Sequence, residues 1–257
     1  VQVFDPRVHE RVVAERRLAT ELISAFEQGQ VRPYFQPIVN LALGGVVGFE
    51  ALARWEHAER GLLVARDFLD TAKRARLMAR LFGVVVDQSC IQAMRWSEAL
   101  GRPMTVAVNL SEFGLFRPKL VEEVAASVAN CGFSPGQLRL EITEEAVRRS
   151  PVEAARIIGR LRDVGASIYL DDFGIGRVSL TELQDLDVAG VKIDGSLVAR
   201  LGSDASTLDL VKGVVSMAGS LRLDVVAEGI ETEAAATICA DLGIILGQGF
   251  VLARPMT

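Results

Sequence analysis

The sequence predicts an α/β fold, a TIM-like (β/α)8 barrel, on three observations. Eight short apolar runs rich in β-branched residues are mostly separated by stretches with helical periodicity, which is the alternation of strands and covering helices in such a barrel. The length of 257 residues suits one barrel of this kind. Most of the runs also end near an acid, an amide or a lysine, and chemistry in these barrels gathers at the carboxyl ends of the strands.

Residues 1–30 and residues 31–257 are expected to be separate units. In the first, apolar residues such as Leu18, Leu22 and Phe26 recur between charged residues, which predicts a helix over about 8–28 that ends at Gly29. Such a helix would suit a linker from a longer parent protein. We expect the barrel domain to occupy the remainder of the chain.

The predicted strands begin with a pair joined by a short connection. Residues 40–45 contain two glycines and form a turn, and a connection this short permits an antiparallel pair. Each later strand is separated from the one before it by a helical stretch. In chain order, the predicted strands cover residues 32–39, 46–54, 105–110, 137–142, 167–170, 190–193, 224–228 and 244–250.

Helical stretches fill most of the segments between these strands. Pro151 opens one of them, at a first-turn position where proline is tolerated. The loop that contains Gly174 precedes a short helix. The predicted helical segments cover residues 67–100 as a helix-rich stretch, then 118–130, 151–163, 180–185, 206–221 and 231–242.

Composition and charge argue against several classes of protein. The chain is 50% hydrophobic and 24% charged with a net charge of −5, and this mild acidity argues against binding to a nucleic acid polymer. It contains neither a run of about 20 apolar residues nor a signal-peptide pattern, so we expect a cytoplasmic protein without direct membrane contact. Any membrane anchor would lie outside this chain. Three scattered cysteines indicate reduced thiols: Cys90, Cys131 and Cys239.

Polar residues from separate strands would meet on one rim of the barrel. They are Glu50, Asn109, Glu141, Asp171, Asp172, Lys192, Glu228 and Gln248. Five carboxylates on one rim would repel one another, so we expect one or two divalent cations as counter-charge. The candidate ligands are all oxygen donors, which favours Mg²⁺ or Mn²⁺ over zinc. His9 and His57 do not fall at predicted strand ends and are expected on the surface.

Asp171 and Asp172 are the centre of this prediction. Alone, the pair is equally well explained by a strand end and a turn, because Asp and Gly are common turn residues. Side chains alternate along a strand, so both acids can face one way only if the strand ends there. Beside the other rim residues, the pair suits a carboxylate bridge between two ions about 3.5–4 Å apart, an arrangement that hydrolyses phosphate esters. Lys192 would orient the attacking water or stabilise phosphoryl charge, and a salt bridge to an acid explains it as well.

Eight ordered motifs carry a resemblance to a known family. They are Tyr34-Phe-Gln-Pro-Ile-Val39, Gly48-Phe-Glu-Ala-Leu-Ala-Arg-Trp55, Val108-Asn-Leu-Ser111, Leu140-Glu-Ile-Thr-Glu144, Asp171-Asp-Phe-Gly174, Val191-Lys-Ile-Asp194, Ala227-Glu-Gly-Ile-Glu231 and Gln248-Gly-Phe250. On these motifs the chain resembles the EAL domain, a bacterial phosphodiesterase family that cleaves the second messenger cyclic di-GMP. The resemblance implies a barrel with one antiparallel strand, hydrolysis of cyclic di-GMP to linear pGpG, and a homodimer in the bacterial cytoplasm.

The resemblance also implies a role for each matching residue. A first metal ion would be held by Glu50, Asn109, Glu141 and Asp171. A second would be held by Asp171, Asp172 and Glu228. Catalysis is assigned to Lys192, in contact with the attacking water, and to Glu228 and Glu50. The substrate's phosphate or guanine groups would be contacted by Gln36, Arg54 and Gln248. Glu144 would steady the loop after Asp172, and Glu231 would support the site from outside it.

Two departures from the family pattern bear on activity. The loop that usually reads Phe-Gly-Thr-Gly-Tyr-Ser-Ser-Leu is here Phe173-Gly-Ile-Gly-Arg-Val-Ser-Leu180, which changes Ile175, Arg177 and Val178. The family links this loop to metal binding, dimer contacts and activation. Residues 72–76 read Ala-Lys-Arg-Ala-Arg where the family usually has two acids and a glycine, and this reverses the local charge.

Three functions are compatible with these residues. A metal-dependent cyclic di-GMP phosphodiesterase accounts for the complete set of predicted ligands. A cyclic di-GMP receptor with weak or no catalysis would account for the altered loop. A barrel enzyme that acts on an enolate would also combine a lysine with acidic metal ligands, but it leaves Gln36, Arg54 and Gln248 unexplained.

Overall fold

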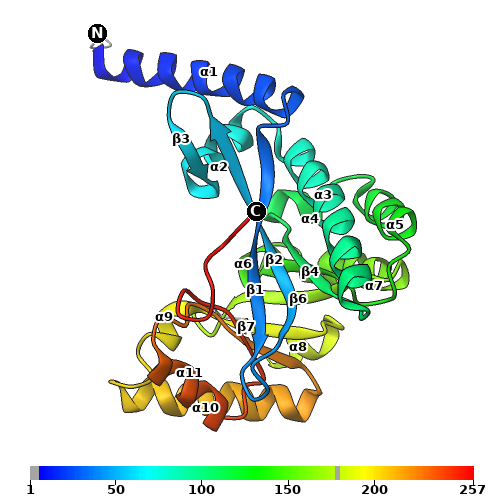
Figure 1. Cartoon of the computed structure of the whole chain (residues 1–257), viewed down its shortest axis with the longest axis vertical. Coiled ribbons are helices and arrows are strands. Elements are labelled where there is room, and N and C mark those ends of the chain that lie inside the picture. Colours follow the sequence, from blue (N-terminus) through cyan, green and yellow to red (C-terminus); the bar gives the residue numbers. More distant parts are fainter. Residues whose placement is uncertain (1–5, 177–179) are drawn as a thin grey trace.

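A closed barrel of eight strands forms the centre of the molecule, which confirms the predicted fold class (Figure 1). This computed structural model describes the backbone of residues 6–176 and 180–257, and the side chains of residues 15–176 and 181–257. The barrel strands are β1 (Val31–Asn40), β2 (Val46–His57), β4 (Thr105–Asn109), β5 (Leu138–Thr143), β6 (Ser167–Phe173), β7 (Gly190–Ile193), β8 (Asp224–Ala227) and β9 (Leu246–Gly247). A ninth strand, β3 (Gly61–Val64), lies outside the barrel and pairs with the last four residues of β2, Arg54 to His57.

The strand β1 is the one that runs against its barrel neighbours. It pairs antiparallel with both β2 and β9, whereas the other neighbouring pairs around the barrel are parallel. The turn between β1 and β2 is fixed by Asn40, whose side-chain oxygen accepts hydrogen bonds from the backbone N–H groups of Ala42 and Leu43. The expectation of one antiparallel strand is therefore confirmed.

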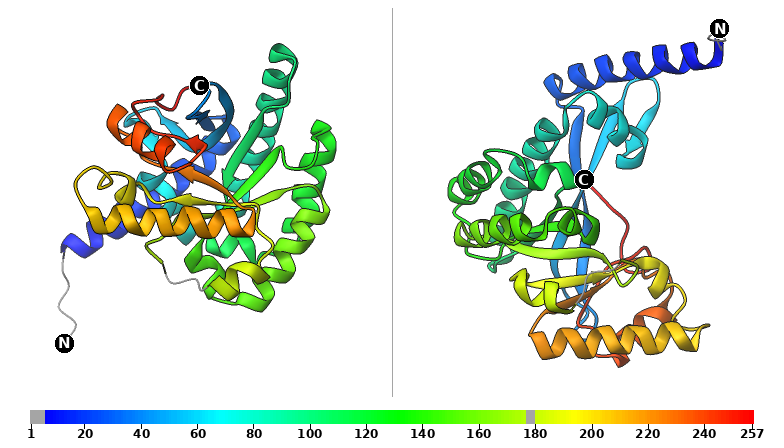
Figure 2. Two further views of the ribbon diagram at one scale, coloured as in Figure 1. Left: turned by 90° about the horizontal axis from the view of Figure 1, so that it is seen from below. Right: turned by 180° about the vertical axis from the view of Figure 1, so that it is seen from behind.

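The helices cover the outside of the barrel (Figure 2). They are α1 (Pro6–Glu27), α2 (Ala65–Arg74), α3 (Met78–Leu100), α4 (Glu112–Leu115), α5 (Leu120–Cys131), α6 (Glu144–Arg148), α7 (Pro151–Asp163), α8 (Leu180–Asp185), α9 (Gly195–Val198), α10 (Ala205–Leu221) and α11 (Glu233–Asp241). The sequence did not predict α4, α6, α9 or β3, because four or five residues are too few to show a periodicity. In the part of the chain that the structure describes, no helix combines the length and the apolar character that a bilayer span requires.

The hairpin of β1 and β2 extends beyond the barrel into a lobe made with α1, α2 and β3 (Figure 1). Leu22 and Phe26 of α1 are buried in the same apolar core as the barrel helices. His57, the last residue of β2, is also buried here, and its Nε2 lies 3.2 Å from Glu21 Oε2. The expectation of a surface histidine away from strand ends is therefore wrong for His57. The division after residue 30 stays a prediction.

The last strand is shorter than predicted, since only Leu246 and Gly247 of residues 244–250 pair as β9. After β9 the chain folds over the end of the barrel and returns to β1. There Phe35 and Met256 exchange two backbone hydrogen bonds, 2.7 and 3.0 Å long. Gly249 makes this path possible, because a Cβ atom on it would collide with the backbone of Ile230.

We predict that Gly249→Ala destabilises the fold by about 2 kcal/mol or more, because the neighbouring group is backbone and cannot move aside cheaply. Gly219→Ala is the matched control: Gly219 lies in α10 with open space around its Cβ position, so alanine should raise stability by about 0.5–1 kcal/mol. Urea unfolding measures both changes. Equal midpoints for wild type and Gly249→Ala would contradict the close packing against Ile230.

Candidate active site

The barrel brings the predicted polar residues together at the carboxyl ends of its parallel strands. Asn109 is the last residue of β4 and pairs in register with Glu141 of β5. Two residues further along β5, Thr143 pairs with Asp171 of β6. These registers fix the height of each side chain along the barrel axis, so residues far apart in sequence face the same space.

Lys192 of β7 is the hub of the site. Its side chain is 1% exposed, and its Nζ lies among four carboxylates from four different strands or strand ends. The distances from Nζ to the nearest carboxylate oxygen are 2.5 Å for Glu228, 2.7 Å for Glu141, 3.4 Å for Glu50 and 3.6 Å for Asp171. Among the described side chains, every buried carboxylate or ammonium belongs to the predicted set: Glu50, Glu141, Glu144 and Lys192.

The charges of this cluster are not balanced by one ammonium. Burial alone would lower the pKa of Lys192, but the surrounding carboxylates raise it well above its usual value, so the lysine stays charged. Burial raises the pKa of Glu228 to about 8, although Lys192 opposes the shift. Burial and the nearby Glu50 carboxylate also raise the pKa of Glu141 well above its usual value. Further positive charge, from protons or from cations, is therefore favoured at this position.

Glu50 of β2 is held in its ionised form by its neighbours. Its two oxygens accept hydrogen bonds from Asn109 Nδ2 at 2.6 Å and from Gln248 Nε2 at 2.5 Å. Burial acts to raise the pKa of Glu50, but Lys192 and these two amides outweigh it and lower the pKa. Glu50 is thus an oriented carboxylate, fixed by β4 on one side and by the segment after β9 on the other.

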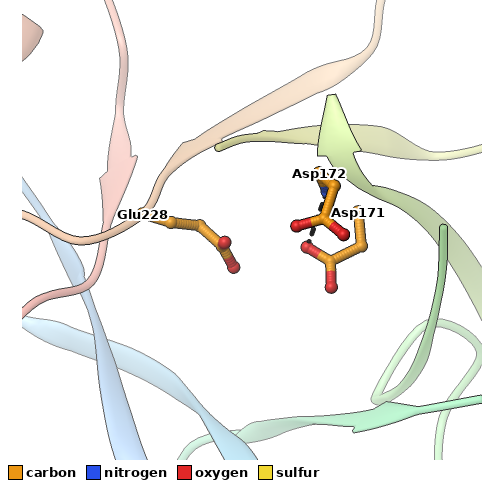
Figure 3. A group of neighbouring side chains, drawn as sticks. All are labelled: Asp171, Asp172 and Glu228. Carbon is orange, nitrogen blue, oxygen red and sulfur yellow. Dashed lines mark hydrogen bonds between the residues drawn. The ribbon is translucent and has the colours of Figure 1, made fainter. Parts of the chain in front are cut away.

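Asp171 and Asp172 face the same way because the strand is locally irregular (Figure 3). The pairing of β6 with β7 slips between Leu170 and Phe173, and Asp172 has a φ of +55°, which is uncommon for residues other than glycine, although Asp adopts it more readily than most. The two carboxylates and that of Glu228 place oxygens within 4.8 Å of one another. The sequence suggested that the strand ends at the acids, but β6 continues through Phe173. The irregular pairing, and not a strand end, turns both acids to the same side.

Three carboxylates at this spacing have the chemistry of a site for a hard divalent cation. Burial and the neighbouring carboxylates Asp171 and Asp194 raise the pKa of Asp172, which is the expected result of crowding like charges. A cation would relieve that crowding. Asp194 is one residue after β7 and lies in one of the motifs, but the sequence indicates no role for it. Its contact with Asp172 depends on the fold of both strand ends.

The remaining predicted residues lie at different distances from this centre. Gln36 of β1 is buried and pairs in register with Glu50, and its Nε2 donates to the carbonyl oxygen of Ala253. Arg54 lies four residues further along β2, where Nη1 donates to the carbonyl of Ala53. Within the described part of the chain, the side chains of Gln36 and Arg54 donate to backbone carbonyls and not to the carboxylates of the cluster.

Glu144 and Glu231 differ sharply in their surroundings. Glu144 is buried at the start of α6, and its Oε1 accepts a hydrogen bond from the backbone N–H of Gly174 at 3.2 Å. A Cβ atom on Gly176 would collide with the same carboxylate, so the loop after Asp172 lies directly on Glu144. Glu231 is exposed and makes no hydrogen bond or ion pair with another described residue.

The altered loop is only partly described. Ile175, which replaces a threonine, is 57% exposed and presents an apolar side chain to solvent. Arg177 and Val178 lie outside the described residues, so the remainder of that departure stays a prediction.

A cavity of about 570 Å³, the first cavity, opens beside the cluster. Its polar side includes Glu50, Asn109 and Glu141. Its apolar wall comes from α2, α3 and α4, with Leu69, Met78, Leu81, Phe82, Val85 and Phe113. This size suits a small-molecule ligand. The sequence did not identify the wall, because apolar residues at helical spacing are indistinguishable from ordinary core until the helices are placed on the barrel.

Comparison with known proteins relates this geometry to named relatives. The chain is 33% identical over 253 residues to the bifunctional diguanylate cyclase/cyclic di-GMP phosphodiesterase MucR of Pseudomonas aeruginosa, covering 98% of this chain and 37% of that protein. It is 30% identical over 244 residues to the cyclic di-GMP phosphodiesterase RocR of the same organism, covering 95% of this chain and 62% of that protein. The chain therefore spans less than two thirds of either relative.

A solved structure and a family model agree with these similarities. The structure of the PaMucR phosphodiesterase in complex with c-di-GMP superposes with a TM-score of 0.89 and 34% sequence identity, covering 93% of this chain and 97% of that one. The family model described as EAL domain matches residues 19–255. The chain belongs to the EAL domain family.

Proposed function

We propose that this chain is a cyclic di-GMP phosphodiesterase that opens the cyclic dinucleotide to linear pGpG with the help of one or two Mg²⁺ or Mn²⁺ ions. The observation that carries the proposal is the buried Lys192 surrounded by oriented carboxylates beside the first cavity. The activities named for MucR and RocR support it, as does the c-di-GMP in the PaMucR complex. Membership of this family favours phosphodiester hydrolysis over enolate chemistry.

The carboxylates fit the proposed ions by their chemistry and spacing. One ion would be held by Asp171, Asp172 and Glu228, whose oxygens already converge. A second would be held by Glu50, Asn109, Glu141 and Asp171. When bound, these ions would neutralise phosphate charge and lower the pKa of a coordinated water, which is the chemistry that hydrolysis requires.

Lys192 would act as a donor and not as a base. Its pKa is raised well above the usual value, so the ammonium has no lone pair with which to accept a proton at neutral pH. Its N–H groups now donate to Glu141 and Glu50 at 2.7 and 3.4 Å. We propose that Lys192 orients the attacking water or stabilises the charge that develops on the phosphoryl oxygens. Glu228 and Glu50 would position the water through the metal ions that they would bind.

Gln248 offers a specific contact for the substrate. Its Nε2 is committed to Glu50, while its Oε1 is buried and accepts no hydrogen bond from the described residues. An unsatisfied buried acceptor favours a ligand N–H group, such as those on a guanine. Gln36 and Arg54 would supply further donors to phosphate or guanine groups, Glu144 would hold the loop after Asp172, and Glu231 would support the site from outside. The homodimer and the absence of a nucleic acid polymer as partner also stay predictions.

Purified protein incubated with cyclic di-GMP and Mg²⁺ or Mn²⁺ should release pGpG, measured by chromatography. Glu50→Gln should slow turnover by about 100-fold or more, the scale expected when one group that stabilises the transition state is lost. Glu145→Gln removes an exposed acid on the neighbouring helix α6 and should leave turnover unchanged. Binding of cyclic di-GMP without product under either ion would instead identify a receptor, the alternative that the altered loop suggested.

Metal binding should be visible without activity. At a Mn²⁺ concentration of ~100 Kd, the wild-type melting temperature should rise by about 5–10 °C, because a ligand that binds only the folded state stabilises it. Asp171→Asn should remove this rise, whereas Asp209→Asn, which alters an exposed acid on α10, should keep it. The proposed metal site would be refuted by an equal rise in both variants, measured by calorimetry.

A further inference from the structure

A second cavity of about 480 Å³ adjoins the first and has the opposite electrostatic character. Its lining residues come from the end of α2, the start of α3, and α4 with the segment after it. Lys73, Met78 and Phe113 line both cavities, so the two share a wall. Four cationic side chains line the second cavity: Lys73, Arg74, Arg76 and Arg117.

These cations are only partly neutralised. Arg117 pairs with Glu123 at 2.7 Å, Arg74 forms an ion pair with Glu15, and Lys73 lies 3.6 Å from Asp70 on the surface of α2. Arg117 also has a buried nitrogen, Nη2, that makes no hydrogen bond with a described residue. Arg76 is exposed and forms no ion pair in the described part of the chain, and no carboxylate is among the described residues that line the cavity. The lining thus attracts anions and contains an unused buried donor.

Arg76 occupies a backbone position that favours glycine. Arg76 directly follows Ala75, the C-cap of α2, and its φ is +59°. Glycine is the favoured residue for a left-handed position after a helix, because a side chain is strained there. Arg76 therefore brings a positive charge to the cavity from a strained backbone position.

We propose that the second cavity binds a nucleoside triphosphate. A triphosphate chain concentrates several negative charges, and its oxygens match the planar donor arrays of the arginines. Phe113 is 59% exposed, with the Arg149 guanidinium over its ring at 4.9 Å, and together with Met78 it offers an apolar surface against which a planar base can pack. The volume is adequate for a ligand with a ring and a short chain. This site is separate from the acidic cluster, and the proposal does not depend on hydrolysis of cyclic di-GMP.

Isothermal titration calorimetry with ATP on the full chain tests the proposal. EDTA in the buffer prevents divalent ions from holding phosphate at the carboxylate cluster. ATP should bind with one site per chain, more tightly than tripolyphosphate or adenosine alone, since the cavity recognises both parts. No binding of ATP would overturn the proposal. Tripolyphosphate or adenosine that binds as tightly as ATP would overturn it as well, because the ligand would then not be a nucleotide.

Arg76→Gly separates binding from folding. It should weaken ATP binding by about tenfold or more through the loss of a charge-assisted contact, while the urea midpoint stays equal or rises because strain is removed. Arg66→Ala, on the exposed first turn of α2, is the matched loss of charge and should leave ATP affinity unchanged. Equal affinities for wild type and Arg76→Gly would place ATP elsewhere and overturn the assignment.

Discussion

The buried ammonium of Lys192 is the interaction on which the rest of the site depends. A charge removed from water needs compensation by partners, and Lys192 obtains it from four carboxylates delivered by β2, β5, β6 and the residue after β8. The carboxylates also lie close to one another, and the ammonium offsets their mutual repulsion. The resulting arrangement is stable only if the strands that carry these residues end at the same height, which links the electrostatics of the site to closure of the barrel.

Two irregular features of the barrel adapt it to this purpose. The antiparallel strand β1 places Gln36 directly opposite Glu50 of β2. The slip between β6 and β7, with Asp172 at positive φ, turns two successive acids toward one space. Strain of this kind persists where the surroundings determine it, and it is common at functional sites. Like-charge crowding at Asp171, Asp172 and Glu228 then makes the space favourable for a cation.

The sequence predicted what depends on local pattern and failed where tertiary packing decides. The barrel class and the convergence of Glu50, Glu141, Asp171 and Lys192 followed from apolar runs that end in polar residues. The antiparallel pair followed from the short connection at residues 40–45. His57 was wrongly expected at the surface because burial of a β2 end against α1 needs the folded lobe. The slip in the pairing of β6 with β7 leaves no periodic signal in the sequence, and neither does the two-residue strand β9. The wall that Phe113 contributes to both cavities is equally invisible before the helices are placed. The strain at Arg76 likewise appears only in the backbone angles.

The central claim is that the carboxylates around Lys192 bind divalent cations. Anomalous diffraction from crystals soaked in Mn²⁺ tests it most directly, because the signal locates the ion itself. The account predicts at least one peak within coordination distance of Asp171, Asp172 and Glu228, with Lys192 turned from some of its present partners. Crystals saturated with Mn²⁺ that show no peak among these residues, or peaks only at surface acids, would contradict it.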